Sequence, residues 1–577
     1  MSNKEIITNF NALKKNLKKD FSGLKNIRIA LIGDSATQFL NLALKGYGFE
    51  EGYHFDIYEA DYNQIEGQVL DTSSELYNFK PDFVIIFQSV QKLAKAFYKS
   101  DRVSFASKHV ENVSHYYLTL TCSSNAKVIY FNFPELNDNV FGNFSNKLEQ
   151  SFVYQIRKIN FELMRLSMSQ KNFNILDYCI LSSQYGKNFA FDPKVYYTSD
   201  MVLSIDILPV VTKNITDIVS SLVGKFKKCL ILDLDNTMWG GIIGDDGIEN
   251  IQIGDLGIGK AFTEFQMWMK QLKQRGIILA VCSKNTESIA KEPFEKHPDM
   301  VLSLDDIAVF VANWNNKADN IRYIQSILNI GFDSMVFLDD NPAEREMVRT
   351  HIPEVFVPEL PEDPTLYLDY LFKLNLFETA SFSEEDEHRT KQYKEEAGRA
   401  IAKQSFTNED DFLINLKMVS QVKPFDAFTV PRIAQLSQRS NQFNLRTVRY
   451  TEDDIEKLMQ SSNYKTLSFT LEDKFGNNGL IAVVILEERK DILFIETWLM
   501  SCRVLKRGME NFTLNKIVQI AIQNNCSKVI GEYIPSAKNG MVKDHYSNLG
   551  FTQINDLWEL DVNSYSPRKC FINTSDV

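Results

Sequence analysis

Cysteine is scarce in this chain, and its cysteines are not paired. There are seven among 577 residues, and no two of them form a CxxC motif. An odd number of scattered cysteines provides neither a disulfide framework nor the paired thiolates of a zinc site. We therefore expect each cysteine to be a small buried apolar side chain, and the protein to work in a reducing cytoplasm.

Long apolar runs are also missing. No segment approaches the roughly 18 apolar residues that a membrane span needs. The first twenty residues carry charges but lack the apolar core of a secretory signal. The 25 glycines and 15 prolines are few for this length, so long structureless linkers are not expected. These absences predict a cytoplasmic protein with no membrane partner.

An excess of positive charge is absent as well. The 63 lysines and arginines are outnumbered by 75 aspartates and glutamates, which gives a net charge of −12. Binding a nucleic acid requires a concentrated cationic surface. We therefore expect no nucleic-acid partner, whereas a small phosphorylated ligand needs only a local site and stays compatible with this charge.

The chain is long enough for three or four domains of about 150 residues each. Its first 200 residues alternate apolar runs with helix-length amphipathic stretches, which is typical of a parallel sheet covered on both faces. The predicted strands are residues 27–33, 55–61, 83–88, 128–133 and 175–181. Helices are predicted over 145–168 and 208–224.

A second alternation of strands and helices starts at Cys229 and predicts another doubly wound sheet. Its elements are an apolar strand from 229, a helix over 259–275, a strand over 276–282, a helix after 317 and a strand over 335–338. The charged segment 378–404 is expected to be an exposed linker helix. The predicted divisions of the chain are 1–222, 223–377, 378–404 and 405–577.

The last segment changes to an α+β pattern. Strands are predicted at 464–471, 480–486, 492–499, 528–534 and 557–562, and helices at 430–438 and 510–523. Thr451 and Asp454 have the spacing of a capping box that opens another helix.

Two carboxylate pairs follow apolar strands of the second alternation. Asp233 and Asp235 come after the strand from Cys229, and Asp339 and Asp340 come after residues 335–338. The carboxyl ends of parallel strands meet at the crevice where open α/β sheets bind ligands. Paired carboxylates repel each other unless a cation lies between them, and hard oxygen ligands suit Mg²⁺. The sequence therefore predicts a Mg²⁺ site at this edge.

The order Asp-x-Asp-x-Thr, serine, lysine, Asp-Asp resembles the four motifs of the haloacid dehalogenase (HAD) superfamily of phosphatases. The resemblance implies that Asp233 attacks phosphorus and that Asp235 acts as general acid and then base. Thr237, Ser283 and Lys317 would bind phosphoryl oxygens. The Mg²⁺ ligands implied in this way are Asp233, the Asp235 main-chain carbonyl, Asp339 and Asp340.

The spacing of these motifs leaves no room for a cap domain after Thr237 or after Ser283. A site without a cap is open, so a large partner such as another protein can reach it.

The wider sequence is similar to the FkbH-like family. The matching segments are DLDNTMWGGIIGDDG (233–247), VCSKN (281–285), FLDDNPAER (337–345), QRSNQFNL (438–445), SCRVLKRG (501–508) and GEYIPSAKN (531–539). The resemblance implies an α/β protein with an SGNH-hydrolase-like doubly wound domain, a HAD-like Rossmannoid domain without a cap and a C-terminal α+β domain like GNAT acetyltransferases. It also implies transfer of a glyceryl unit from 1,3-bisphosphoglycerate to the thiol of an acyl carrier protein, with loss of phosphate.

Glyceryl transfer calls for a group that can carry an acyl unit, and Cys282 stands at a strand end beside Ser283 and Lys284. A thiolate there would be favoured by the lysine. The alternative is that Cys282 is an ordinary buried strand cysteine, and both interpretations stay open.

The flanking domains contain weaker candidates. Gly33-Asp34-Ser35 resembles the nucleophile block of SGNH hydrolases, but no histidine stands where the family needs its base. We therefore expect a degenerate structural or docking domain, and hydrolase activity by Ser35 is the alternative. In the C-terminal domain, Arg503, Arg507 and Gly508 precede a helix and would bind a pyrophosphate or the phosphate of a carrier's pantetheine arm. The alternative is a solvated basic start of a helix. Glu510 replaces a glycine of the usual acetyl-CoA pattern.

Two other functions remain possible. One is a HAD-type phosphatase that acts on a phosphorylated small molecule or a protein-tethered substrate, with Cys282 inert. The other is a non-catalytic scaffold of a biosynthetic cluster, which the retention of so many paired acids disfavours.

Overall fold

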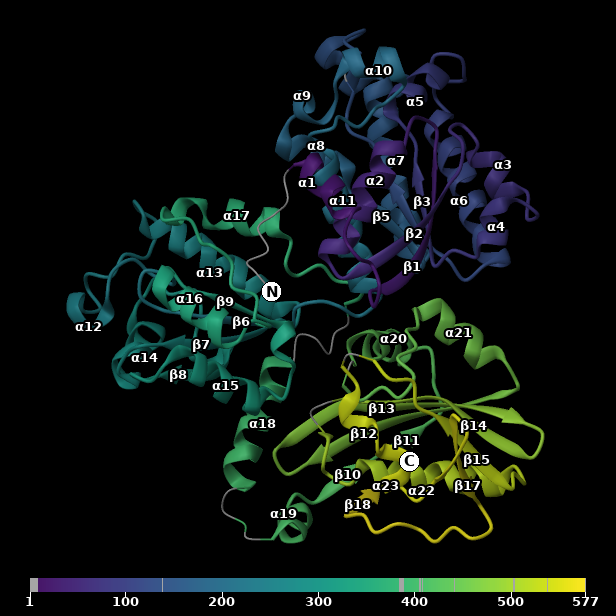
Figure 1. The fold of residues 1–577 in the computed structure, drawn as a ribbon. Helices are drawn as coiled ribbons and strands as arrows, with labels where there is room; N and C mark the ends of the chain where they lie inside the picture. The colour runs from purple at the N-terminus through teal and green to yellow at the C-terminus, as the bar shows by residue number, and fades with distance from the viewer. Residues whose placement is uncertain are drawn as a thin grey trace. The chain divides into compact units, whose positions relative to one another are not determined.

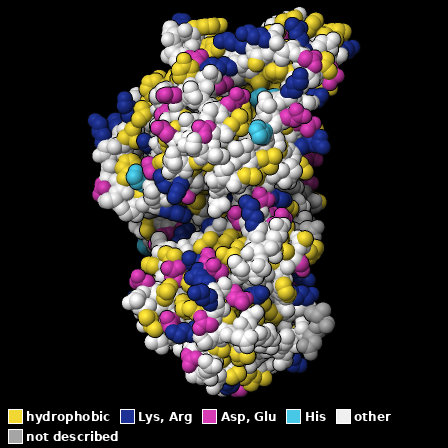
Figure 2. Space-filling view, turned by 90° about the vertical axis from the view of Figure 1, so that its right-hand side faces the viewer, with side chains coloured by type: hydrophobic (Ala, Val, Ile, Leu, Met, Phe, Trp, Pro, Cys, Tyr) yellow, Lys and Arg dark blue, Asp and Glu magenta, His cyan; other side chains and the backbone are white. Residues whose placement is uncertain are grey.

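The structure, a computed structural model, describes residues 9–136, 138–382, 389–403, 406, 408–440, 442–501, 504–536 and 538–575. The chain forms two compact units that divide between Val219 and Ser220. Figure 1 draws the first unit in purple and blue and the second in teal to yellow. Acidic and basic side chains are interspersed over the face shown in Figure 2. In the described part of the chain, no helix is long and apolar enough to cross a membrane.

The N-terminal unit contains a five-stranded parallel sheet in the order β2-β1-β3-β4-β5. Its strands are β1 Lys25–Gly33, β2 Tyr53–Glu59, β3 Phe83–Phe87, β4 Lys127–Phe131 and β5 Phe173–Leu176. Its helices are α1 Phe10–Asn16, α2 Gln38–Glu50, α3 Ile65–Leu70, α4 Glu75–Phe79, α5 Val90–Phe97, α6 Phe105–Ser123, α7 Phe152–Ser169, α8 Tyr178–Tyr185, α9 Lys187–Ala190, α10 Pro193–Ser199 and α11 Leu208–Leu222. All five predicted strands are present.

Two predicted boundaries in this unit are wrong, and capping side chains explain both. The strand predicted to reach residue 181 ends at Leu176, because Asp177 accepts a hydrogen bond from the Ile180 amide and starts α8. The helix predicted from 145 starts at Phe152, because the Ser151 hydroxyl accepts from the Tyr154 amide. A carboxylate or hydroxyl that takes up a free amide fixes where a helix begins.

The second unit begins with the four-stranded parallel sheet of what we call the middle domain, in the order β8-β7-β6-β9. Its strands are β6 Cys229–Leu232, β7 Ile278–Ser283, β8 Ile307–Ala312 and β9 Met335–Leu338. Its helices are α12 Ile243–Asp246, α13 Gly259–Gln274, α14 Glu287–Lys296, α15 Lys317–Leu328, α16 Pro342–His351 and α17 Tyr367–Leu374. The sequence analysis missed β8, although its run of apolar residues is a strand signal.

The connections after the first two motifs are short. Between Thr237 and α13 the only helix is the four-residue α12, and between Ser283 and Lys317 lie α14, one 3₁₀ turn and β8. These segments provide no separate domain that could cover the carboxyl edge of the sheet.

The predicted linker segment contains α18 Arg389–Lys403, which packs against β8 and α15 of the middle domain and against β13 of the sheet that follows. It therefore joins the two sheets within one compact unit instead of lying exposed. Residues 383–388 and 404 of the predicted linker lie outside the described residues.

The C-terminal domain is built on a mixed nine-stranded sheet. Its path is β16-β17-β15-β14-β13-β12-β10-β18, with β11 paired to β12. The strands are β10 Met418–Ser420, β11 Val422–Lys423, β12 Tyr464–Asp473, β13 Gly476–Arg489, β14 Ile492–Met500, β15 Lys528–Glu532, β16 Thr552–Ile554, β17 Leu557–Asp561 and β18 Ile572–Thr574. The helices are α19 Glu409–Asn415, α20 Val430–Arg439, α21 Glu452–Gln460, α22 Met509–Gln523 and α23 His545–Asn548. The capping box of Thr451 and Asp454 is confirmed.

Strands β14 and β15 separate beyond their first residues. They pair in parallel only from Ile492 to Phe494. Further along, Leu445 lies between them: its amide donates to the Trp498 carbonyl, and its carbonyl accepts from the Ile534 amide. The chain itself thus fills this part of the gap between the two strands.

Candidate active site

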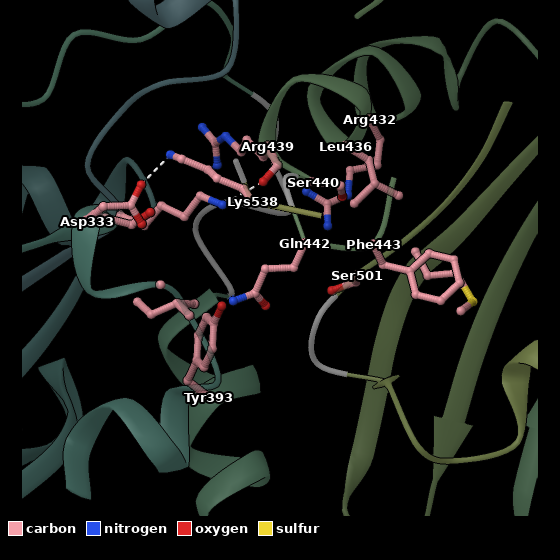
Figure 3. A pocket seen from close by; sticks show the side chains of 15 residues that line it. Asp333, Tyr393, Arg432, Leu436, Arg439, Ser440, Gln442, Phe443, Ser501 and Lys538 are labelled. Atoms are coloured by element: carbon pink, nitrogen blue, oxygen red, sulfur yellow. Dashed lines mark hydrogen bonds and ion pairs between the residues drawn. The ribbon is translucent and has the colours of Figure 1, made fainter. Parts of the chain in front are cut away.

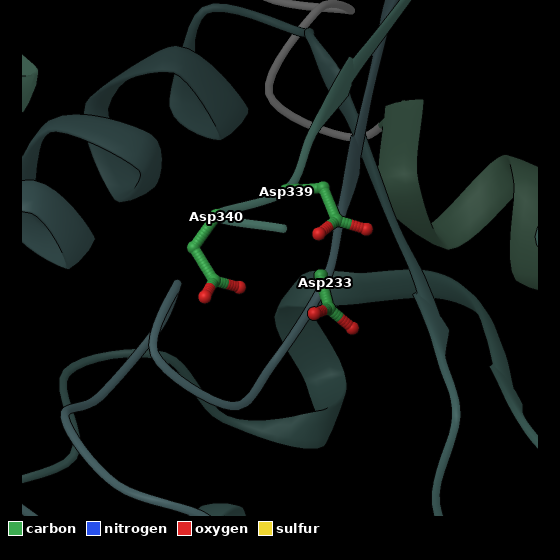
Figure 4. A group of neighbouring side chains, drawn as sticks. All are labelled: Asp233, Asp339 and Asp340. Atoms are coloured by element: carbon green, nitrogen blue, oxygen red, sulfur yellow. The ribbon is translucent and has the colours of Figure 1, made fainter. Parts of the chain in front are cut away.

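Three carboxylates meet at the carboxyl edge of the middle-domain sheet. Asp233 follows β6 and Asp339 follows β9, and these neighbouring strands end in register, with Leu232 opposite Leu338. Ligand oxygens of Asp233, Asp339 and Asp340 lie within 4.8 Å of one another. Figure 4 shows the three side chains converging from the two strand ends. The arrangement offers a set of oxygen ligands that could hold a metal ion.

Lys317 is the cation within this group. Its Nζ lies 3.0 Å from Asp233 Oδ1 and 2.5 Å from Asp339 Oδ2, and the residue is 2% exposed. Although burial opposes its charge, Asp233 and Asp339 raise the pKa of Lys317 above the usual lysine value. One buried lysine does not offset three neighbouring carboxylates, so the site retains a negative charge that a divalent cation can balance.

The pKa values of the two aspartates after β9 reflect this crowding. Burial and the charge of Asp233 raise the pKa of Asp339 to about 7, against the attraction of Lys317. Burial and Asp233 also raise the pKa of Asp340. Thr237 is fully buried and exchanges hydrogen bonds with Asp340, donating from its hydroxyl at 3.3 Å and accepting from the main-chain amide at 3.1 Å.

Arg345 holds the Asp339–Asp340 turn in place, a role that the sequence analysis missed. Its Nη1 donates to the carbonyls of Asp339 at 2.8 Å and Asp340 at 2.7 Å, while Nε and Nη2 donate to Glu359. The arginine is 4% exposed. It closes the segment FLDDNPAER, so its position in that motif was the available signal.

Asp235 lies beside the carboxylate group but is held separately. One carboxylate oxygen accepts from the Trp239 indole at 3.1 Å and the Ile243 amide at 3.0 Å, and the other accepts from Asn285 at 3.1 Å. Burial and the charge of Asp233 raise its pKa. The Asp235 side chain is not part of the three-carboxylate group, and its predicted metal ligand, the main-chain carbonyl, stays a prediction.

Ser283 and Cys282 occupy the end of β7. Both are almost fully buried, at 1% and 0% exposed. The Cys282 thiol packs in the apolar core and lies 3.7 Å from the Lys317 carbonyl. Burial raises the pKa of this thiol, and Lys284 binds Glu344 at 2.6 Å. The expectation that Lys284 would favour a thiolate at Cys282 is therefore wrong.

Ser35 in the N-terminal unit is buried and has no hydrogen-bond partner for its hydroxyl. The Asp34 carboxylate beside it accepts from the main-chain amide and hydroxyl of Ser89. Lys92 pairs with Asp200 at 2.9 Å. None of the hydrogen bonds of the described residues joins a histidine to Ser35. That this is a degenerate hydrolase domain stays a prediction.

Arg507 does not have the surroundings of a ligand-binding residue. It is 6% exposed, and its guanidinium binds Asp473 at 3.3 Å and also Glu396 of α18. We correct the prediction that Arg507 binds a pantetheine phosphate, because its guanidinium is paired with two carboxylates of the protein itself. Gly508 adopts a left-handed conformation (φ 81°) at the start of α22, and Arg503 lies outside the described residues.

Comparison with known proteins places the chain in a family. Residues 28–220 match the family described as FkbH, N-terminal domain. The crystal structure of the N-terminal part of a Bacteroides fragilis protein, containing a phosphatase domain and complexed with Mg, is 54% identical. The match covers 65% of this chain and all of that chain, with a TM-score of 0.63. The chain belongs to the FkbH family.

The C-terminal domain of this FkbH-family protein matches acetyltransferase structures at low scores. The ribosomal-protein-S18-alanine N-acetyltransferase from Escherichia coli is 14% identical over 25% of this chain and 94% of that chain, with a TM-score of 0.21. A spermidine N-acetyltransferase from Vibrio cholerae, in complex with CoA and spermine, is also 14% identical, over 26% of this chain and 96% of that chain (TM-score 0.20). These values carry no argument about activity. No curated protein matches the FkbH-family chain.

Proposed function

We propose that this protein transfers a glyceryl unit from 1,3-bisphosphoglycerate to the thiol of an acyl carrier protein, with release of phosphate and with Mg²⁺ as cofactor. The observation that carries the proposal is the buried group of Asp233, Asp339 and Asp340 with Lys317 between two of its members. A site of this composition handles phosphoryl groups. We propose the acyl carrier protein as acceptor because the chain belongs to the FkbH family.

Mg²⁺ suits this site because all the converging ligands are hard oxygens. Asp233, Asp339 and Asp340 would hold the ion, which would reduce the repulsion between an anionic nucleophile and an anionic phosphate. The relative with 54% identity was crystallised with Mg, which supports the same metal here.

The phosphatase half-reaction uses two carboxylates in sequence. An Asp233 oxygen bonds to phosphorus while the bond from phosphorus to the substrate oxygen breaks, and that oxygen takes a proton from Asp235. A water then attacks the aspartyl phosphate, gives its proton to Asp235 and releases inorganic phosphate. Lys317 and Ser283 stabilise the charge on the phosphoryl oxygens during both steps.

In the acyl-transfer half-reaction, the carrier thiol attacks the acyl carbon of the bisphosphorylated substrate. A carbon–sulfur bond forms, the carbon–oxygen bond to the acyl phosphate breaks, and its electron pair leaves with phosphate. The thiol proton goes to solvent or to the departing phosphate. The second phosphate, an ordinary ester, is then the substrate for Asp233.

The direct test is to incubate the protein with 1,3-bisphosphoglycerate, Mg²⁺ and either pantetheine or candidate acyl carrier proteins. We expect the thiol compound to gain the mass of a glyceryl unit while phosphate is released. Phosphate release with no acyl transfer to any thiol would reject the transferase and leave the phosphatase.

A plain phosphatase is the second candidate. The burial of Cys282 disfavours a thioester on this cysteine, which neither the phosphatase nor direct attack by the carrier thiol requires. If the cysteine carries no acyl group, Cys282→Ala will leave both phosphate release and carrier loading within about threefold of wild type, because no transition-state contact is removed. Cys229→Ala is the matched control, since Cys229 is a fully buried cysteine on the adjacent strand β6. Loss of carrier loading in Cys282→Ala alone would establish the covalent route.

Arg345 provides a test of how the metal site is positioned. Arg345→Gln removes hydrogen bonds to the Asp339 and Asp340 carbonyls, so we expect the Mg²⁺ concentration for half-maximal phosphatase activity to rise about 10- to 100-fold. Arg349→Gln is the control, because Arg349 also binds Glu359 but donates its other hydrogen bonds to Val357. An unchanged Mg²⁺ requirement in Arg345→Gln would show that the turn does not depend on this arginine.

A further inference from the structure

Two loops at the carboxyl edge of the middle-domain sheet carry exposed apolar residues. Trp314, between β8 and α15, is 74% exposed, and Ile242, in the loop after β6, is 44% exposed. Tryptophan is largely buried in most folded proteins, and the other four tryptophans of this chain are buried or half-buried. The exposure of Trp314 beside a site built from polar groups therefore indicates a contact with something outside the chain.

Hydrogen bonds connect both loops to the catalytic residues. The Asn313 amide donates to the Ser283 carbonyl at 3.1 Å, and Trp314 is the next residue. The loop ends at Lys317, the buried lysine of the carboxylate group, which is the first residue of α15. On the other loop, the residue after Ile242 donates its amide to Asp235 at 3.0 Å. Trp314 and Ile242 thus lie on the rim of the catalytic centre.

The Trp314 loop has a fixed conformation. The side-chain amides of Asn313 and Asn320 bond to each other at 2.9 and 3.2 Å, and the Asn315 main-chain amide donates to the Asn313 side chain at 2.9 Å. The Asn316 side chain caps α15. A short loop with so many internal bonds holds Trp314 in one place, so an interacting group does not have to order it first.

The cavity shown in Figure 3, of about 250 Å³, does not offer an alternative place for the same ligand. It is lined from the middle and C-terminal domains of the second compact unit, by Lys228 and Arg432 among others. Lys228 directly precedes β6 and Ser334 directly precedes β9, whereas Asp233 and Asp339 directly follow these strands. A four-residue strand spans about 13 Å. A group next to the catalytic carboxylates therefore meets the loops of the carboxyl edge and not this cavity.

We propose that Trp314 binds the pantetheine arm of a carrier-tethered substrate while the phosphate of that substrate is at the catalytic carboxylates. This inference rests on the proposed function. After acyl transfer the phosphate ester is joined to the arm through a thioester, and with no cap over the site the arm leaves it across the rim.

The chemistry of the arm fits an indole ring. Its methyl and methylene groups can pack against the ring, whereas a short phosphorylated acid ends within the polar centre. Burial of about 55 Å² of apolar surface, a fraction of what a tryptophan side chain offers, is worth about tenfold in affinity. Trp314 is thus a specificity residue that favours the tethered substrate over free phosphate monoesters.

The test compares phosphate release by the full-length protein from two synthetic thioesters of 3-phosphoglycerate in saturating Mg²⁺. One carries pantetheine and the other an S-methyl group, so both have the same charge and the same reacting phosphate. We expect kcat/KM to be at least tenfold higher for the pantetheine thioester. Equal kcat/KM values for the two compounds would overturn the proposal.

Variants assign this preference to one side chain. Trp314→Ala should bring the ratio of the two kcat/KM values close to one by raising KM for the pantetheine thioester, whereas Trp314→Phe should retain most of the ratio. Tyr323→Ala is the matched control, because Tyr323 is an exposed aromatic residue on the helix that follows the same loop. Its ratio should equal that of the wild type. An unchanged ratio in Trp314→Ala, or an equal loss in Tyr323→Ala, would overturn the proposal.

A binding measurement distinguishes failure of this inference from failure of the proposed function. Asp233→Asn protein, which is not expected to turn over, is mixed with each thioester, and tryptophan fluorescence is quenched with acrylamide. We expect the pantetheine thioester alone to protect the exposed tryptophan, and Trp314→Phe in the same background to abolish this protection. Lack of protection would overturn the proposal whatever the rates. Protection without phosphate release by the wild type would instead reject the proposed reaction and leave the Trp314 contact established.

Discussion

Asp233→Asn is expected to abolish phosphate release, with a loss of roughly 10⁴-fold or more, the scale of removing a covalent nucleophile. The amide does not attack phosphorus, and it removes one of the three carboxylates that converge at the carboxyl edge. The measurement is release of inorganic phosphate from a phosphate monoester at saturating Mg²⁺. Addition of excess chelator to the wild type should have a comparable effect.

The control for this experiment is Asp245→Asn, which makes the same chemical change on the exposed helix α12 of the same loop. It should retain wild-type activity. Phosphate release at the wild-type rate by Asp233→Asn, or by the wild type in chelator, would reject the aspartyl-phosphate mechanism.

The second large effect concerns stability. Asp473 is buried on β12 and receives two hydrogen bonds from Arg399 of α18, at 2.8 and 2.9 Å, and one from Arg507 at 3.3 Å. Asp473→Asn removes the charge that both buried arginines share. Breaking a buried ion pair on one side costs about 3–5 kcal/mol, so we expect the free energy of unfolding in urea to fall by about that amount.

Glu472→Gln is the matched control, because Glu472 is the exposed neighbour of Asp473 on the same strand. Its effect should stay within about 0.5 kcal/mol. A loss below about 1 kcal/mol in Asp473→Asn would mean that Glu395 and Glu396 compensate the two arginines.

The Asp473 cluster also explains why a motif-based prediction for Arg507 failed. The segment SCRVLKRG places two arginines before a helix, which is a reasonable signal for phosphate binding. The partners of Arg507 come from α18 and β12, 111 and 34 residues earlier in the chain. The sequence around the motif does not show these distant acidic partners. Only the folded structure therefore reveals that the Arg507 guanidinium is already paired with carboxylates.

The sequence by itself determined the two parallel sheets and the order of the residues at the catalytic edge. Apolar runs that end in Asp233, Ser283 and Asp339 identify buried strands with polar carboxyl ends, and parallel pairing then brings those ends together. The reason is local. A run of apolar residues predicts the strand, and the polar residue that follows the run marks where the strand ends.

The tertiary structure alone decided which of these side chains are free to act. Cys282 and Ser283 are adjacent in sequence, but the thiol packs in the core, and burial rather than the neighbouring lysine sets its pKa. The positioning contacts of Arg345, and the cavity formed jointly by Lys228 and Arg432, join segments that are far apart in the chain. Burial and long-range pairing depend on how the elements pack against one another. Apolar residues that repeat every two or every 3.6 residues predict strands and helices, but they do not tell which elements pack together.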